Sequence, residues 1–277
     1  MESFSVDGLT AVIQSLLPEP HSGLLVGLLF GTKASLSREF YDALVTSGTL
    51  HIIALSGMNV TIIMNMVASL FQSKVGKRWA SVVSIVSVVW FVWFVRPSST
   101  IVRAAIMGGL TLIAVLFGRQ YWALFSWVLA IGIMVGIRPA WAIELSFQLS
   151  ALATLGIILF GKVSANVSID KQPTSSVLVH IKNAMYDNLH LTLAAQVFTI
   201  PLILFHFHRV SLVSPFANLA IGWVIAPLTI LGWCTAILGW VFLPLGQAIS
   251  WVDWVLLEYM IHAIRIASKI PLASIGW

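Results

Sequence analysis

Long apolar runs alternate with short segments that carry charges or prolines, and this pattern predicts the elements of the chain. Six runs predict transmembrane helices at residues 50–71, 79–95, 101–117, 121–137, 141–160 and 189–207. Their lengths suit the roughly 20 apolar residues that one helical crossing needs. A further stretch at 215–243 has no charge but contains Pro227, so it predicts either one tilted span or two broken half-helices. Pro201 is a second helix-breaking position.

Both ends of the chain have an amphipathic pattern instead. The apolar residues of the N-terminal segment, residues 1–31, are interrupted at Pro18-Glu19-Pro20-His21, which favours a position partly in the membrane interface. In the C-terminal segment, residues 246–272, four polar positions follow helical spacing: Glu258, His262, Arg265 and Lys269. This stripe fits a helix on the membrane surface, and a polar channel wall is the alternative.

Together these elements predict an all-α fold, a polytopic integral membrane bundle of about seven or eight transmembrane helices with amphipathic interfacial helices at both ends. We expect a single membrane domain over residues 1–277. It is expected to contain a first helical bundle at 50–160, a polar linker at 161–188 and a second bundle at 189–243. The turn-rich stretch at 170–176 is the basis for the linker.

Composition supports a membrane protein. Of 277 residues, 59% are hydrophobic and 9% are charged, against roughly 25% charged in an ordinary soluble domain. These values exclude a soluble globular protein and leave no room for a sizeable soluble domain. The single cysteine, Cys234, excludes an intrachain disulfide framework. The net charge of +5 is explained by the loops of a membrane protein and does not itself indicate nucleic acid.

Arg103 is the costliest residue of the predicted spans, because a central arginine costs about 2.5–3.5 kcal/mol on insertion scales. It must therefore snorkel, pair or face water. Glu144 begins its span on the same side of the membrane and is the expected partner. Gln148 lies one turn further on, beside a stripe of three hydroxyl residues: Ser146, Ser150 and Thr154. A structural hydrogen-bonded seam and a polar pathway explain this pattern equally well.

The first predicted span also carries polar residues, because His51 is followed by Ser56-Gly57 and Asn59. A Ser-Gly pair in a membrane helix permits a bend or a close backbone approach. A hydrolase in which His51 or His190 activates Ser56 is disfavoured, since the sequence has no nucleophile-elbow pattern and no oxyanion-hole element. We therefore expect no catalytic residue here.

Later spans repeat the combination of polar residues and prolines. Gln196 lies on a polar helix face before Pro201, and Asn218 begins the stretch that Pro227 interrupts. Prolines in membrane helices free backbone acceptors that such side chains can use. The residues alone thus indicate a polar intramembrane pathway or a hydrogen-bonded bundle core, without a metal or cofactor signature.

Short pieces in a fixed order carry a resemblance to a known family. They are Leu17-Pro-Glu-Pro-His, residues 23–31, 36–37, 47–60, 103–107, 118–119, 147–150, 195–196 with Pro201, 206–211, and 214–218 with Pro227. Through these pieces the chain resembles the ComEC competence-protein family, the inner-membrane DNA-translocation proteins of natural transformation. The resemblance implies that the membrane domain is of the competence channel type.

The resemblance also implies a function. It implies a multi-pass protein of the cytoplasmic membrane through which single-stranded DNA is imported, with cationic and hydrogen-bonding groups replacing the hydration of the phosphates. Arg103 would contact phosphate, with Glu144 as its orienting partner. The other expected lining positions are His51, Ser56, Gly57, Asn59, Gln148, Ser150, Gln196 and Asn218.

Departures from the family pattern limit what is implied. Asn59 stands where a second histidine is usual, so a role that needs an imidazole is not implied there, while a hydrogen-bonding role is kept. The chain has no His-x-His-x-Asp-His cluster, so a metal-dependent nuclease role is not implied either. We expect no enzymatic activity, no metal and no cofactor. No Gly-rich phosphate loop occurs, so a motor would be a partner.

The expected partners are single-stranded DNA, the lipid bilayer and other competence proteins on separate chains, namely a DNA receptor, a motor ATPase, and a nuclease or OB-like domain. Homo-oligomerisation is a further expectation. A small-molecule or ion transporter with a polar intramembrane pathway is the alternative function, since the same polar stripes and the proline-interrupted stretch suit it.

Overall fold

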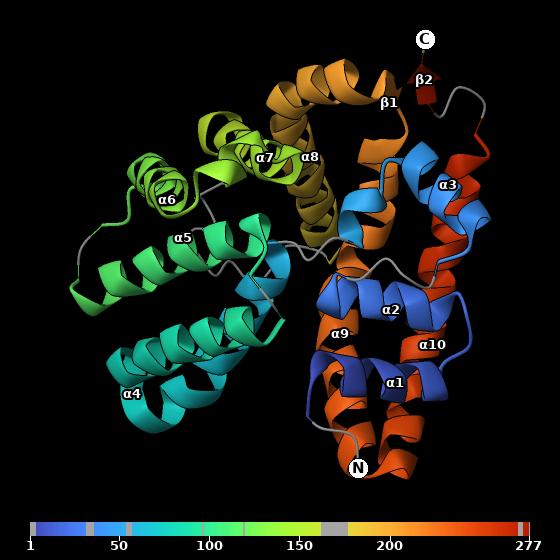
Figure 1. The fold of residues 1–277 in the computed structure, drawn as a ribbon, viewed down its shortest axis with the longest axis horizontal. Helices are drawn as coiled ribbons and strands as arrows, with labels where there is room; N and C mark the ends of the chain where they lie inside the picture. The colour runs from blue at the N-terminus through green and yellow to red at the C-terminus, as the bar shows by residue number, and fades with distance from the viewer. Residues whose placement is uncertain are drawn as a thin grey trace.

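The computed structural model describes residues 4–31, 36–53, 57–95, 97–118, 120–161, 177–270 and 274–276. The described part is almost entirely helical (Figure 1). The helices are α1 (Val6–Leu16), α2 (His21–Phe30), α3 (Arg38–Ser47), α4 (Gly57–Val95), α5 (Ser99–Leu116), α6 (Ala123–Ile137), α7 (Leu145–Phe160), α8 (Val177–Phe207), α9 (Ser214–Val241) and α10 (Leu243–Ser268), with the 3-10 turns η1 (Leu50–Ile52) and η2 (Pro139–Ile143). Two short strands, β1 (Arg209–Ser211) and β2 (Ser274–Gly276), pair antiparallel. The predicted all-α class is confirmed.

The hairpin of α9 and α10 forms the core together with the N-terminal helices. These two long helices run side by side, α1 and α2 lie across them, and α3 packs on α10 (Figure 1). Helix α2 packs closely on α9, because a Cβ added at Gly232 would lie only 2.7 Å from Leu25 Cδ1. Leu24, Leu28 and Ile221 are among the fully buried residues of this core. The hairpin is therefore the main packing scaffold of the molecule.

Helices α4 to α7 form a second group beside the hairpin, and α8 contacts both α7 and α9 (Figure 1). Helix α4 contains a break at Gly76, where φ is 80° and ψ is 164°. Glycine adopts this positive φ without the steric cost that a Cβ imposes. The break lies between the two predicted spans at 50–71 and 79–95, so the boundary between them is a glycine kink within α4.

Four helical segments are long and apolar enough to cross a membrane: Arg78–Val95, Ser99–Leu116, Tyr186–His206 and Ser214–Val241. Shorter apolar helices are α1, α2, α6 and α7. The chain is thus a helical membrane protein, and the predicted total of seven or eight crossings remains a prediction. Helix α9 continues through Pro227 as one helix, which favours the single tilted span over two half-helices.

The predictions for the chain ends and the linker have different outcomes. Helix α10 buries Leu257 and Ile264 and exposes Arg265, but its exposed side also carries large apolar residues such as Trp251 and Val255, so the predicted amphipathic surface helix stays a prediction. Helix α2 differs from the amphipathic prediction, since all ten of its residues are buried. It is apolar around its whole circumference, which is typical of a core helix. Residues 162–176 of the predicted linker lie outside the described residues, and α8 begins at Val177, inside the predicted linker.

Candidate functional site

Arg103 is buried between α5 and α7, with 8% of its surface exposed. Its Nε and Nη2 donate to Ser150 Oγ at 3.2 and 2.7 Å. Its Nη1 donates to Thr154 Oγ1 and lies 3.7 Å from Met107 Sδ. Ser150 and Thr154 are one turn apart on α7, so the predicted hydroxyl stripe faces the guanidinium. Of the predicted lining residues, Arg103 and Ser150 are brought into direct contact.

The expected pair between Arg103 and Glu144 is wrong. Glu144 is exposed at the N-cap of α7, before the first helical turn. Arg103 instead binds Ser150 and Thr154, which lie in the second and third turns of α7. No carboxylate of the described residues forms an ion pair with Arg103. Gln148 also turns away, since its Nε2 donates to Ala142 O at 2.9 Å and so ties α7 to η2. Arg103 is therefore held by neutral hydroxyl groups.

Gly57 brings the start of α4 close to this arginine. A Cβ added at Gly57 would lie 3.0 Å from Ala104 Cβ and 3.8 Å from Arg103 Nη2. The absence of a side chain thus lets α4 approach α5 beside the guanidinium. Ser56 lies outside the described residues. We call Gly57, Arg103, Ser150 and Thr154 the arginine cluster.

A second cluster is centred on Ser214 at the start of α9. Ser214 Oγ accepts from Gln196 Nε2 at 3.3 Å and from Asn218 Nδ2 at 3.4 Å, and donates to Gly48 O at 3.5 Å. His51 Nδ1 lies 3.1 Å from the same Gly48 oxygen. Gln196 of α8 and Asn218 of α9 therefore meet at one hydroxyl, and His51 of η1 joins them through the Gly48 carbonyl. We call this group the serine cluster.

Gly48 makes the serine cluster sterically feasible. It ends α3 with φ at +71°, and an added Cβ would lie 2.6 Å from Ser214 Cβ and 2.9 Å from Ser211 Cβ. The cluster also contains two buried polar atoms without a hydrogen-bond partner in the described residues, Ser211 Oγ and Asn218 Oδ1. Sequence reasoning did not assign Gly48 or Ser214 a lining role. Their signals were a helix-ending glycine and a serine before Pro215.

Asn59 belongs to neither cluster. It is 1% exposed, and its Nδ2 donates to Leu28 O at 2.7 Å. Leu28 lies in the last turn of α2, where carbonyl groups lack intrahelical donors. Asn59 therefore caps the C-terminal end of α2 from α4. Its Oδ1 is buried without a partner in the described residues.

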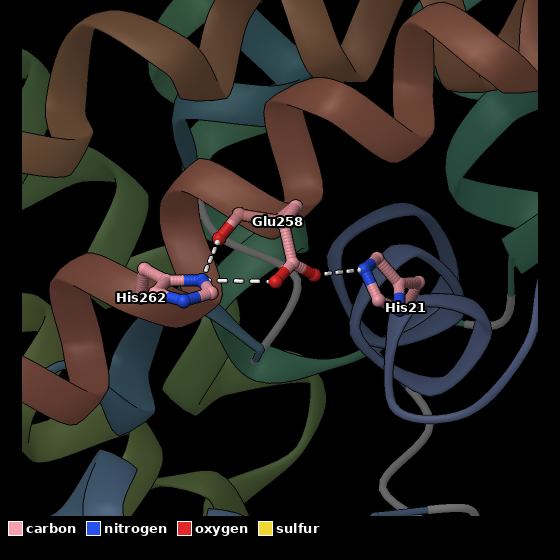
Figure 2. A network of polar contacts seen from close by, with 3 residues as sticks. All are labelled: His21, Glu258 and His262. Carbon is pink, nitrogen blue, oxygen red and sulfur yellow. Dashed lines mark hydrogen bonds and ion pairs between the residues drawn. The ribbon is translucent and has the colours of Figure 1, made fainter.

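A third polar network, which the sequence reasoning missed, joins α2 to α10 (Figure 2). His21 Nε2 lies 2.6 Å from Glu258 Oε2, and His262 Nδ1 lies 2.9 Å from Glu258 Oε1. His21 also stacks on Trp254, with ring centroids 5.5 Å apart. The i, i+4 spacing of Glu258 and His262 was visible in the sequence, but the contact with His21 spans the whole chain. Among the described residues, no group of three or more His, Cys, Asp or Glu side chains is arranged to hold a metal ion.

Long apolar helices that bury polar clusters define a helical membrane protein whose interior is partly polar. The chain belongs to the competence protein family, because that family's model matches residues 28–277. The predicted family is thereby confirmed, and the chain has a competence-related role.

Two curated relatives are similar to the chain. It is 24% identical over 204 residues to ComE operon protein 3 of Bacillus subtilis (strain 168), covering 72% of this chain and 24% of that protein. It is 23% identical over 223 residues to the uncharacterized protein YcaI of Escherichia coli (strain K12), covering 76% of this chain and 28% of that protein. The chain thus spans about a quarter of the length of these relatives. No solved structure matches it significantly.

Proposed function

We propose that the chain forms the membrane path through which single-stranded DNA enters the cytoplasm during natural transformation. Membership of the competence family and the buried polar clusters support this proposal. DNA carries one negative charge per nucleotide, so a path across hydrocarbon needs groups that replace the hydration of phosphate. The arginine and serine clusters offer such groups in a chain of which 59% of the residues are hydrophobic.

The buried guanidinium of Arg103 is the observation that carries the proposal. It has hydroxyl partners and no carboxylate partner among the described residues, so its positive charge is not neutralised by a neighbouring side chain. Guanidinium binds phosphate through two parallel N–H bonds, and such charge-assisted bonds are stronger than bonds to neutral hydroxyls. A phosphate that reaches Arg103 can therefore displace the Ser150 and Thr154 hydroxyls. Those hydroxyls can then rotate and donate to the same anion.

The serine cluster would contact other parts of the strand. Gln196, Asn218 and His51 supply neutral donors and acceptors, which pair with base edges or sugars without requiring one sequence. The bonds to Ser214 Oγ are 3.3 and 3.4 Å long, longer than the usual 2.9–3.0 Å for N–H···O bonds. These weak contacts are easily exchanged for contacts with a passing nucleotide.

The proposal extends to the setting of the protein. We place it in the cytoplasmic membrane as a multi-pass protein that acts by transport and not by catalysis, without a cofactor. Its partners would be other competence proteins, including a DNA receptor, a motor ATPase, and a nuclease or OB-like domain on separate chains, with self-association as a further expectation.

The test is delivery of labelled DNA to the cytoplasm in the native host after clean deletion of the gene. The deletion is complemented with wild type, Arg103→Ala, Arg103→Lys or Arg265→Ala at matched membrane abundance. Arg265 is an exposed arginine of α10 and serves as the control. We expect deletion and Arg103→Ala to lower delivery at least tenfold, Arg103→Lys to restore part of it, and Arg265→Ala to match wild type.

Normal DNA delivery in the deletion strain would refute the proposal and direct attention to small-molecule or ion transport. Equal delivery by Arg103→Ala and wild type would remove Arg103 from the path. Membrane insertion is checked in each strain by protease accessibility, so that loss of the protein is not read as loss of transport.

A further inference from the structure

Asp253 is a carboxylic acid buried inside the α9–α10 hairpin. Its surface is 0% exposed, and its Oδ2 accepts from Thr235 Oγ1 on α9 at 2.5 Å. Its Oδ1 is buried and has no hydrogen-bond partner in the described residues. Thr235 lies within a helix long and apolar enough to cross a membrane. A titratable group is thus enclosed beside a candidate span, with half of its hydrogen-bonding capacity unused.

No cation stands near enough to compensate a charge on this carboxyl in the described structure. Helix α9 contains no Asp, Glu, Lys, Arg or His. On α10, His262 and Arg265 follow Asp253 by nine and twelve residues, and Lys269, just past the end of the helix, by sixteen, which is about 14, 18 and 24 Å along a helix. Glu258 lies on another side of α10, where it binds His21 (Figure 2).

The other helices packed on α10 supply no partner either. Two titratable side chains on these helices are not fully exposed: His21, which binds Glu258, and the half-buried Tyr41. The others are exposed, namely Asp7 on α1 and Arg38, Glu39 and Asp42 on α3. The acid therefore faces apolar packing and a single hydroxyl. Burying an ionised carboxylate without a cation is far more costly than burying the neutral acid.

We propose that Asp253 is a proton-binding site within the α9–α10 hairpin that exchanges one proton with water. In the packed hairpin Oδ1 carries the proton and Oδ2 accepts from Thr235. When water reaches Oδ1, the O–H bond breaks, the proton passes to water and the carboxylate is hydrated. This inference rests on the proposed import function: proton release at Asp253 would let a transmembrane proton gradient supply energy for import.

The protonation itself is tested without DNA. Infrared spectra of the full chain in lipid nanodiscs at neutral pH are compared for wild type, Asp253→Asn and Asp42→Asn, the last being an exposed carboxyl of α3. We expect the C=O stretching band of a protonated carboxylic acid in wild type and Asp42→Asn, and its loss in Asp253→Asn. Absence of that band from wild type would overturn the proton site, whatever the import assay shows.

The coupling is tested by import of labelled DNA with and without a protonophore that collapses the gradient. We expect the protonophore to lower the import of labelled DNA by wild type at least tenfold. Asp253→Asn, which keeps a Thr235 acceptor but cannot release a proton, should import at the low collapsed level under both conditions, and Asp253→Glu should recover part of the dependence. A wild-type response by Asp253→Asn would overturn the coupling. Unchanged import in the gene deletion would refute the proposed function, while the infrared band still decides the proton site.

Discussion

The contact between α7 and α8 at Gly156 is expected to control the position of the arginine cluster. Gly156 is buried, and a Cβ placed there would overlap the carbonyl oxygen of Ala194 on α8 and lie 3.1 Å from its carbonyl carbon. These are backbone atoms, so no side-chain rotation can relieve the overlap. Gly156→Ala must therefore push α7 away from α8. Because α7 carries Ser150 and Thr154, the displacement also reaches Arg103.

The magnitude follows from two opposing terms. Replacing glycine by alanine inside a helix stabilises the helix by about 0.8–1.0 kcal/mol. Overpacking a close contact destabilises the fold by about 1–3 kcal/mol. Gly132→Ala in α6 is the matched control, because nothing lies within 4 Å of an added Cβ there. Both variants share the helix-propensity gain. The difference in their free energies of unfolding thus isolates the overpacking, about 1–3 kcal/mol, with the upper part of the range expected for a backbone contact.

The assay is reversible unfolding in mixed micelles, followed by tryptophan fluorescence. Gly156→Ala should be less stable than wild type and Gly132→Ala slightly more stable. In the import assay, Gly156→Ala should lose delivery and Gly132→Ala should retain it. Equal free energies of unfolding for the two variants would refute the close approach of α7 to α8.

Two further substitutions test the polar contacts outside the clusters by the same unfolding measurement. His21→Ala removes a partner of Glu258 and should lower the free energy of unfolding by about 1.5 kcal/mol, the lower end for a bond to a charged group because Glu258 is one-third exposed. His262→Ala removes an exposed contact worth about 0.5 kcal/mol, and an equal effect of the two substitutions would contradict the prediction. Asn59→Ala leaves the carbonyl of Leu28 buried and unpaired and should cost about 1–3 kcal/mol; wild-type stability would show that α2 does not need this cap.

Hydrophobic periodicity predicted the fold better than it predicted the contacts. Apolar runs mark membrane helices because each crossing must satisfy its own backbone groups, and α5 and α9 lie where the runs placed them. Helix α2 was predicted as amphipathic because prolines interrupt its run, although the absence of charge in its ten residues was a readable sign of full burial.

Pairing between helices was not readable in the same way. Glu144 was expected beside Arg103 because both begin their spans on one side, but their depth depends on where each helix starts, and α7 starts after Glu144. The serine cluster shows the converse case. Gln196 and Asn218 were selected singly as polar residues before prolines, while their meeting at Ser214 depends on how α8 and α9 cross.

Helix α8 connects the two clusters, and this connection determines how they can move. Ala194 of α8 packs on Gly156 of α7, and Gln196, two residues further along α8, binds Ser214 of the serine cluster. Helix α8 therefore cannot shift along α7 without also moving Gln196 relative to Ser214. A DNA strand that displaces Gln196 from Ser214 would shift α8. The shift would then press on the contact between Ala194 and Gly156, which positions α7 and its Ser150 beside Arg103. Because interdigitated backbones resist gradual deformation, we expect the two clusters to open together, and Gly156→Ala to disturb both.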